Sequence, residues 1–147
     1  MTTSQTTPAH AVQSGSTSRA AAAARPLRLF LTLDAVVTGV NGLIYLVAAG
    51  PVGDLLGVST GLLRGIGAFL TVFGLLVGLA AARPVPSATA TKVIIEANLL
   101  WTVASIATAI FGWVDSNTVG TVWTLMQAAT VGLFAVLQIS GLKKLNS

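Results

Sequence analysis

The sequence predicts an all-α membrane protein, namely an antiparallel bundle of four transmembrane helices with both termini in the cytoplasm. Of its 147 residues, 54% are hydrophobic and only 8% are charged, whereas a soluble domain carries about 25% charged residues. Four apolar stretches each come close to the ~20 residues that a helix needs to cross the ~30 Å hydrocarbon core of a bilayer. Basic residues gather in alternate connections between these stretches, as they do in multi-pass proteins.

Residues 1–26 precede the predicted membrane domain, which covers residues 27–144. This tail is rich in Thr, Ser, Ala and Gln and lacks apolar periodicity. Such a segment buries too little surface to offset the entropy lost on ordering, so we expect a disordered cytoplasmic tail. No apolar run of about 7–15 residues follows the Met, which argues against a secretory signal. The basic, Ser-rich composition also resembles an organellar transit peptide.

The four predicted helices cover residues 29–49, 62–82, 93–113 and 119–139. These stretches are too long and too continuous for the strands of a membrane barrel, which alternate over about ten residues. A helix satisfies its own backbone hydrogen bonds, as a lipid environment requires. The short connections predict that consecutive helices pack against each other.

The charged residues outside the spans indicate the orientation. Seven of the eight basic residues flank the spans at one side, at Arg19, Arg25, Arg28, Arg83, Lys92, Lys143 and Lys144. The other two connections contain only acids, Asp54 and Asp115. The positive-inside rule then places both termini and the middle connection in the cytoplasm. This distribution reflects topology and does not form a phosphate-binding patch, so we expect a lipid bilayer and no nucleic acid as the partner.

Two connections contain further signals. Pro84 and Pro86 end the second helix. The first connection contains apolar residues that favour a short amphipathic turn on the membrane surface, at Val52, Leu55, Leu56 and Val58.

Polar side chains inside a hydrocarbon layer are costly and therefore are candidates for function. In the first helix, four of them share one face, at Asp34, Thr38, Asn41 and Tyr45. The third helix carries Glu96 and a stripe at Asn98, Trp101, Ser105 and Thr108, and the fourth carries a face with Trp123, Gln127, Thr130, Phe134 and Gln138. By depth, one set lies in the cytoplasmic half, at Asp34, Glu96, Asn98 and Gln138, whereas Asn41 and Gln127 lie near the midplane.

The candidate ion-coupling residues are Asp34, Asn41, Glu96, Asn98 and Gln127. In a functional interpretation, Asp34 and Glu96 exchange protons or cations with a substrate, and Asn41 and Gln127 line its route. In a structural interpretation, both acids lie in the first turns of their helices, where the macrodipole favours a carboxylate. Asn41 and Gln127 then hydrogen-bond each other across the bundle.

In the structural interpretation, cationic neighbours also stabilise the two acids, with Arg28 near Asp34 and Lys92 near Glu96. Arg64 is the one basic residue inside a predicted span. It either contacts an anionic substrate or extends to the outer interface, where it meets Asp54 or Asp115.

The second helix is rich in glycine, and glycines let a neighbouring helix approach closely. Two Gly-x-x-x-Gly motifs occur, at Gly61 with Gly65 and at Gly74 with Gly78. Gly67, Thr71, Gly74 and Gly78 form one groove at helical spacing. The packing partner is either another helix of the same chain or a second protomer.

The chain contains no Cys and a single histidine, His10, in the tail. The spans therefore lack the side chains that four kinds of chemistry need, namely thiol exchange, iron–sulfur ligation, thiolate metal binding and haem binding by paired histidines. No nucleophile–base pair or phosphate-binding loop is present either, so we expect no enzyme activity, no metal and no cofactor.

Several segments resemble small four-helix membrane proteins of actinobacteria, a group known only as uncharacterised integral membrane proteins. The similar segments are LDAVVTGVNGLIYL, GLLRGIGAFLTVFGLLVGL, EANLLWTVASI and MQAATVGLFAVLQISGLKK. The resemblance covers about residues 27–144 and implies a multi-pass protein of a bacterial inner membrane. A more distant similarity of architecture links the chain to the DoxX-like group.

Two functions fit these observations. The first is a structural or accessory membrane component, acting as a homo-oligomer or within a larger complex. The alternative is a small oligomeric transporter coupled to protons or cations through Asp34 and Glu96.

Overall fold

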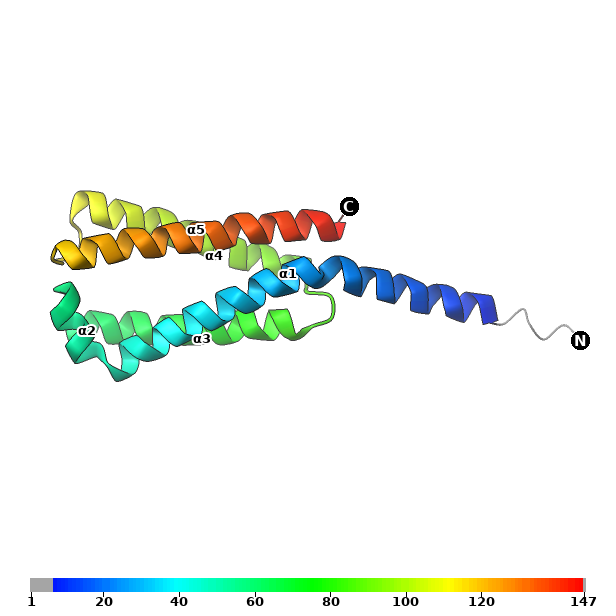
Figure 1. Cartoon of the computed structure of the whole chain (residues 1–147), viewed down its shortest axis with the longest axis horizontal. Helices are drawn as coiled ribbons and strands as arrows, with labels where there is room; N and C mark the ends of the chain where they lie inside the picture. Colours follow the sequence, from blue (N-terminus) through cyan, green and yellow to red (C-terminus); the bar gives the residue numbers. More distant parts are fainter. Residues whose placement is uncertain (1–6, 147) are drawn as a thin grey trace, which may run out of the picture.

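The computed structural model describes residues 7–146, with side chains from residue 18 onward. Regular structure in this part of the chain is entirely helical (Figure 1), with α1 (Thr7–Val47), α2 (Ala49–Leu56), α3 (Thr60–Ala82), α4 (Ala88–Phe111) and α5 (Thr118–Asn146). Four segments are long and apolar enough to cross a membrane, at Ser18–Val47, Thr60–Ala82, Ala88–Phe111 and Thr118–Asn146. The predicted all-helical class with four apolar spans is confirmed.

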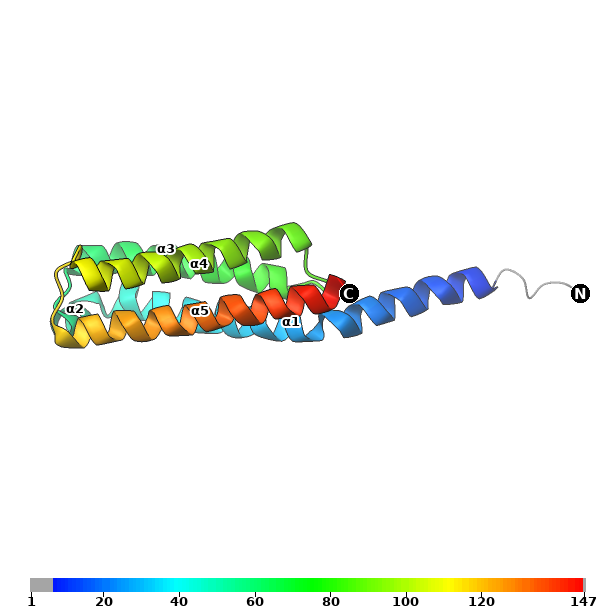
Figure 2. The same cartoon turned by 90° about the horizontal axis from the view of Figure 1, so that it is seen from above.

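The long helices are arranged as two pairs. Helix α1 packs mainly on α3 and α4 mainly on α5, and contacts between α1 and α5 join the pairs. Helices α3 and α4 touch very little, although a short connection joins them. Figures 1 and 2 show α2 and the α4–α5 connection at one end of the bundle, here the α2 end. The α3–α4 connection and the C-terminus lie at the other, here the C-terminal end.

Helix α1 differs most from the sequence prediction. It begins at Thr7 and projects beyond the bundle (Figure 1), whereas disorder was expected over residues 1–26; residues 1–6 lie outside the described part. Residues 20–24 are all alanine, and alanine has the highest helix propensity of any residue type. Pro26 lies inside this helix and leaves one backbone carbonyl without its usual N–H donor.

The ends of the other helices follow from capping residues. The Ser87 hydroxyl accepts a hydrogen bond from the Ala90 N–H, so α4 begins at Ala88 and not near residue 93. Gly112 adopts a positive φ of 65° and ends α4 at Phe111, because glycine adopts this conformation without steric cost. Helix α5 continues past residue 139 to Asn146.

Glycines allow α1 and α3 to pack at very short range. A methyl group built on Gly74 lies 2.8 Å from the Cα atom of Gly39, and one built on Gly42 lies 2.6 Å from the backbone N of Thr71. Gly67 is equally crowded, and Gly78 has only ordinary contact with Ala35. The predicted glycine groove therefore packs against a helix of the same chain.

The first Gly-x-x-x-Gly motif has a different environment. Nothing lies within 4 Å of a methyl group built on Gly61 or Gly65. This pair does not contribute to packing within the chain.

Asn117 joins the two connections at the α2 end. Its backbone N–H donates to the Leu56 carbonyl over 3.0 Å, and its side-chain amide donates to the Leu55 carbonyl over 3.0 Å. Its side-chain oxygen accepts from the Gly120 N–H over 2.8 Å, which caps α5. The predicted amphipathic turn is thus a short helix, α2, that is fixed to the start of α5.

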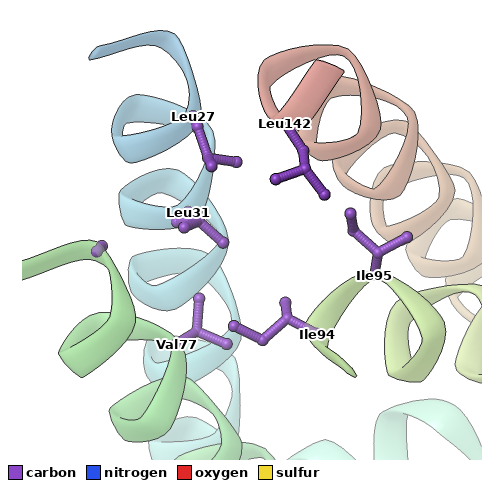
Figure 3. Packing of buried hydrophobic residues seen from close by; sticks show 7 residues of the cluster. Leu27, Leu31, Val77, Ile94, Ile95 and Leu142 are labelled. Carbon is purple, nitrogen blue, oxygen red and sulfur yellow. The ribbon is translucent and has the colours of Figure 1, made fainter. Parts of the chain in front are cut away.

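An apolar cluster fills the C-terminal end of the bundle. Leu27 and Leu31 of α1 and Val77 of α3 face residues of α4 and α5 (Figure 3), the latter being Ile94, Ile95 and Leu142. Only 17–28% of the most apolar window of each long helix is buried within the chain. The rest of each window lies on the surface of the bundle, which is therefore apolar. Such a surface suits contact with lipid.

Candidate functional site

A buried hydrogen-bond cluster lies next to the apolar cluster, one helical turn toward the α2 end. It consists of Asp34 and Thr38 of α1, Asn98 of α4 and Gln138 of α5, here the Asp34 cluster. Asp34 and Gln138 are completely buried, and Asn98 is 4% exposed. The helical repeat explains the position, since Asp34, Asn98 and Gln138 lie three or four residues, about one turn, from Leu31, Ile95 and Leu142 on the faces that already point inward.

The carboxyl group of Asp34 accepts three hydrogen bonds. Its Oδ2 atom accepts from the Asn98 Nδ2 atom over 2.8 Å and from the Gln138 Nε2 atom over 2.7 Å. Its Oδ1 atom accepts from the Thr38 hydroxyl over 2.8 Å. A fourth bond joins the Asn98 Nδ2 atom to the Gln138 Oε1 atom over 3.0 Å. The cluster therefore ties three helices together through one carboxyl group.

The surroundings of Asp34 are polar but contain no cation that pairs with it, within residues 18–146. The Arg28 guanidinium instead donates from Nε to the Ala81 carbonyl over 3.0 Å, at the end of α3. Asp34 also lies far inside α1, which begins at Thr7, so its predicted position in the first turn of a helix is wrong. The donors to its carboxyl group are instead the neutral side chains of Thr38, Asn98 and Gln138.

Glu96 does not join this cluster. It is exposed, and it lines a shallow pocket between the start of α4 and the end of α5, which Lys92 and Lys143 also line. The two acids of the proposed coupling site therefore occupy separate faces. Because α4 begins at Ala88, Glu96 also lies beyond the first turn of its helix.

A second cluster lies closer to the α2 end. The Tyr45 hydroxyl oxygen of α1 accepts from the Trp123 Nε1 atom over 2.7 Å and from the Gln127 Nε2 atom over 2.9 Å, both on α5. Tyr45 is 4% exposed. Gln127 thus bonds Tyr45, and the side chain of Asn41, its expected partner, makes no hydrogen bond within the described side chains.

Asn41 lies half-buried in a lateral cavity of about 430 Å³ between α1 and α5. Gln127 also lines this cavity, together with apolar side chains. The two amides are therefore in the same region of the bundle without being bonded to each other.

The predicted ion pair of Arg64 with Asp54 does not form between the described side chains. Both residues are exposed. Arg64 belongs to α3 and Asp54 to α2, so both lie toward the α2 end.

Four residues of the two clusters were missing from the sequence-based candidates for coupling, namely Thr38, Tyr45, Trp123 and Gln138. Each of them shares a helical stripe with a candidate residue, and that shared stripe was the available signal. Periodicity alone did not identify them, because it gives a face and not the distances between side chains on different helices.

Aromatic rings and cavities separate the two clusters. Phe69 of α3 stacks on Trp101 of α4 with ring centroids 5.7 Å apart. A small cavity of about 30 Å³ lies between Trp101 and the Asp34 cluster, with Thr38 and Asn98 in its wall. A cavity of about 300 Å³ lies on the side of Trp101 toward the α2 end, and Tyr45, Trp123 and Gln127 line it.

Comparison of the chain with models of protein families, with curated proteins and with solved structures found no match. The description of the fold and of the candidate site therefore depends on the four apolar spans and on the two hydrogen-bond clusters. Together they describe a multi-pass membrane protein.

Proposed function

We propose that this chain is a structural or accessory component of a bacterial inner membrane, in which four antiparallel spans form one rigid unit. Both termini and the α3–α4 connection face the cytoplasm in this proposal. The positive-inside rule supports that orientation, because Arg83 lies in this connection and Lys143 and Lys144 end α5. The α2 end, with Asp54 and Asp115, then faces outward.

The observation that carries the proposal is the complete pairing of Asp34. Its two oxygens accept three hydrogen bonds from side chains of α1, α4 and α5, and each buried side-chain nitrogen or oxygen atom among the described residues makes at least one hydrogen bond. A carboxyl group held in this way serves well as a tie between helices. Interhelical hydrogen bonds in membranes contribute about 0.6 kcal/mol on average and up to about 1.7 kcal/mol.

Coupled transport is the second candidate, and one observation favours it. A completely buried carboxyl group without a paired cation is a typical site for a proton or a small cation in membrane proteins. The adjacent cavity of about 30 Å³ has room for a water molecule, which needs about 10–15 Å³. Glu96 lies elsewhere, so transport of this kind would depend on Asp34 alone.

Asparagine at position 34 separates the two functions. The amide oxygen of Asp34→Asn still accepts from Asn98 and Gln138, and its NH₂ group can donate to Thr38. The structural role predicts that this variant loses less than about 1 kcal/mol of unfolding free energy, whereas Asp34→Leu, which leaves the buried amide donors unpaired, loses about 2–3 kcal/mol.

The same variant tests transport in proteoliposomes. A pH-sensitive dye inside the vesicles reports proton flux under an imposed potassium diffusion potential. We expect equal flux for the native chain, Asp34→Asn and the exposed control Glu96→Gln. A flux that Asp34→Asn abolishes and Glu96→Gln retains would overturn the structural proposal in favour of proton coupling.

A further inference from the structure

The cavity of about 300 Å³ near the α2 end has features of a binding site. It lies between α3, α4 and α5, where α3 and α4 touch very little. Tyr45 of α1 closes one side, and the wall is mainly apolar, with Leu62, Leu63 and Ile66 among its residues. Ligand pockets in proteins commonly combine apolar walls with a few polar groups that converge.

Tyr45 presents a hydrogen-bond donor that lacks an acceptor. Its oxygen already accepts from the Trp123 indole and from the Gln127 amide, and a phenol carries one hydrogen of its own. Among the side chains from residue 18 onward, no group accepts that hydrogen. Because Tyr45 is 4% exposed, its donor is buried, and a buried donor without an acceptor is unfavourable.

Two more polar groups in the wall are unpaired. Trp101 and Ser105 line the cavity, and neither the indole N–H nor the hydroxyl makes a hydrogen bond within the described residues. In contrast, Thr108 and Thr124 donate to the carbonyls of Ala104 and Gly120. The unpaired groups therefore include donors from both α1 and α4.

We propose that this cavity binds a membrane-soluble molecule with an apolar body and a carbonyl oxygen, which accepts the hydrogen of Tyr45. A lipid acyl chain offers no acceptor for this donor. An anion is a poor fit because no basic side chain lines the cavity. The inference concerns a different part of the bundle from the Asp34 cluster and does not depend on the proposed structural function.

Benzophenone is a suitable probe, because its carbonyl is both a hydrogen-bond acceptor and the group that crosslinks to nearby C–H bonds under light. The complete chain in phosphatidylcholine vesicles is irradiated at increasing benzophenone concentrations, and mass spectrometry locates and counts the adducts. We expect saturable labelling of peptides of α3, α4 and α5 that line the cavity. Diphenylmethane, which has the same rings and no oxygen, should compete at least about fivefold more weakly than benzophenone itself, as the loss of one hydrogen bond implies.

Three variants test the role of the individual groups. Tyr45→Phe keeps the ring and removes the donor, so half-saturation should need about fivefold more benzophenone. Thr32→Val is the control, since its hydroxyl bonds the Arg28 carbonyl on the exposed side of α1 and does not line this cavity, and it should label like the native chain. Ser105→Phe fills the cavity and should abolish saturable labelling.

The proposal is overturned if diphenylmethane competes as well as benzophenone, or if Tyr45→Phe labels like the native chain. Labelling that is scattered over lipid-facing residues and insensitive to Ser105→Phe would also overturn it, since this is the pattern of a bulk lipid phase. If Tyr45→Phe does not fold, the comparison of the two competitors on the native chain and the Ser105→Phe variant decide the question.

Discussion

The close approach of α1 and α3 gives a sharp prediction for Gly42→Ala. The added methyl group would lie 2.6 Å from the Thr71 backbone N and 2.9 Å from the Gly67 carbonyl oxygen. Both atoms belong to the backbone of α3, so a side-chain rotation cannot relieve the overlap. Overpacking of this kind costs about 1–3 kcal/mol, while alanine regains up to about 1 kcal/mol of helix propensity over glycine. We expect a net loss of about 1–2 kcal/mol of unfolding free energy.

Gly65→Ala is the matched control on α3. Nothing lies within 4 Å of its added methyl group, so it should unfold at the same or a slightly higher detergent fraction than the native chain. The assay is unfolding in mixed micelles with a rising mole fraction of dodecyl sulfate, followed by near-ultraviolet circular dichroism of the aromatic residues. If Gly42→Ala and Gly65→Ala unfold at the same fraction, α1 and α3 do not pack through their glycines as described.

Two further predictions concern helix ends. Asn117→Ala removes the cap of α5 and the side-chain bond to the Leu55 carbonyl. We expect a loss of about 1–2 kcal/mol of unfolding free energy in the same assay and faster backbone hydrogen exchange in α2. Unchanged exchange would contradict the role of Asn117 in fixing α2 to the start of α5. Arg28→Met removes the hydrogen bond to the Ala81 carbonyl and a cation near the end of α3, at a cost of about 1 kcal/mol; equal stability would show that this contact contributes nothing.

The sequence predicted the number and the class of the long helices because both depend on local properties. Hydrocarbon thickness determines how many apolar residues a span needs, and this is visible in a single chain. The start of α4 was harder to predict from the sequence. Ser87 caps the helix, but the apolar stretch on which the prediction relied begins only at residue 93. The helical course of residues 7–26 was missed because a low content of large apolar residues outweighed the alanine run.

The partners of the polar side chains were harder to predict. The stripes placed Asp34, Asn98 and Gln138 at a similar depth, and these residues do meet. Glu96 shares that depth but points outward, because two residues along a helix correspond to a rotation of roughly 200°. Gln127 bonds Tyr45 and not Asn41, a choice that depends on how α1 and α5 are rotated toward each other.

The central claim is that Asp34 ties α1 to α5 through Gln138, and a double-mutant cycle measures it directly. Asp34→Leu, Gln138→Leu and the double variant are compared with the native chain by unfolding in mixed micelles. We predict that the sum of the unfolding free energies lost in the two single variants exceeds the loss in the double variant by about 1–2 kcal/mol, since each single change already breaks the shared bond. Losses that add within about 0.5 kcal/mol would contradict the account.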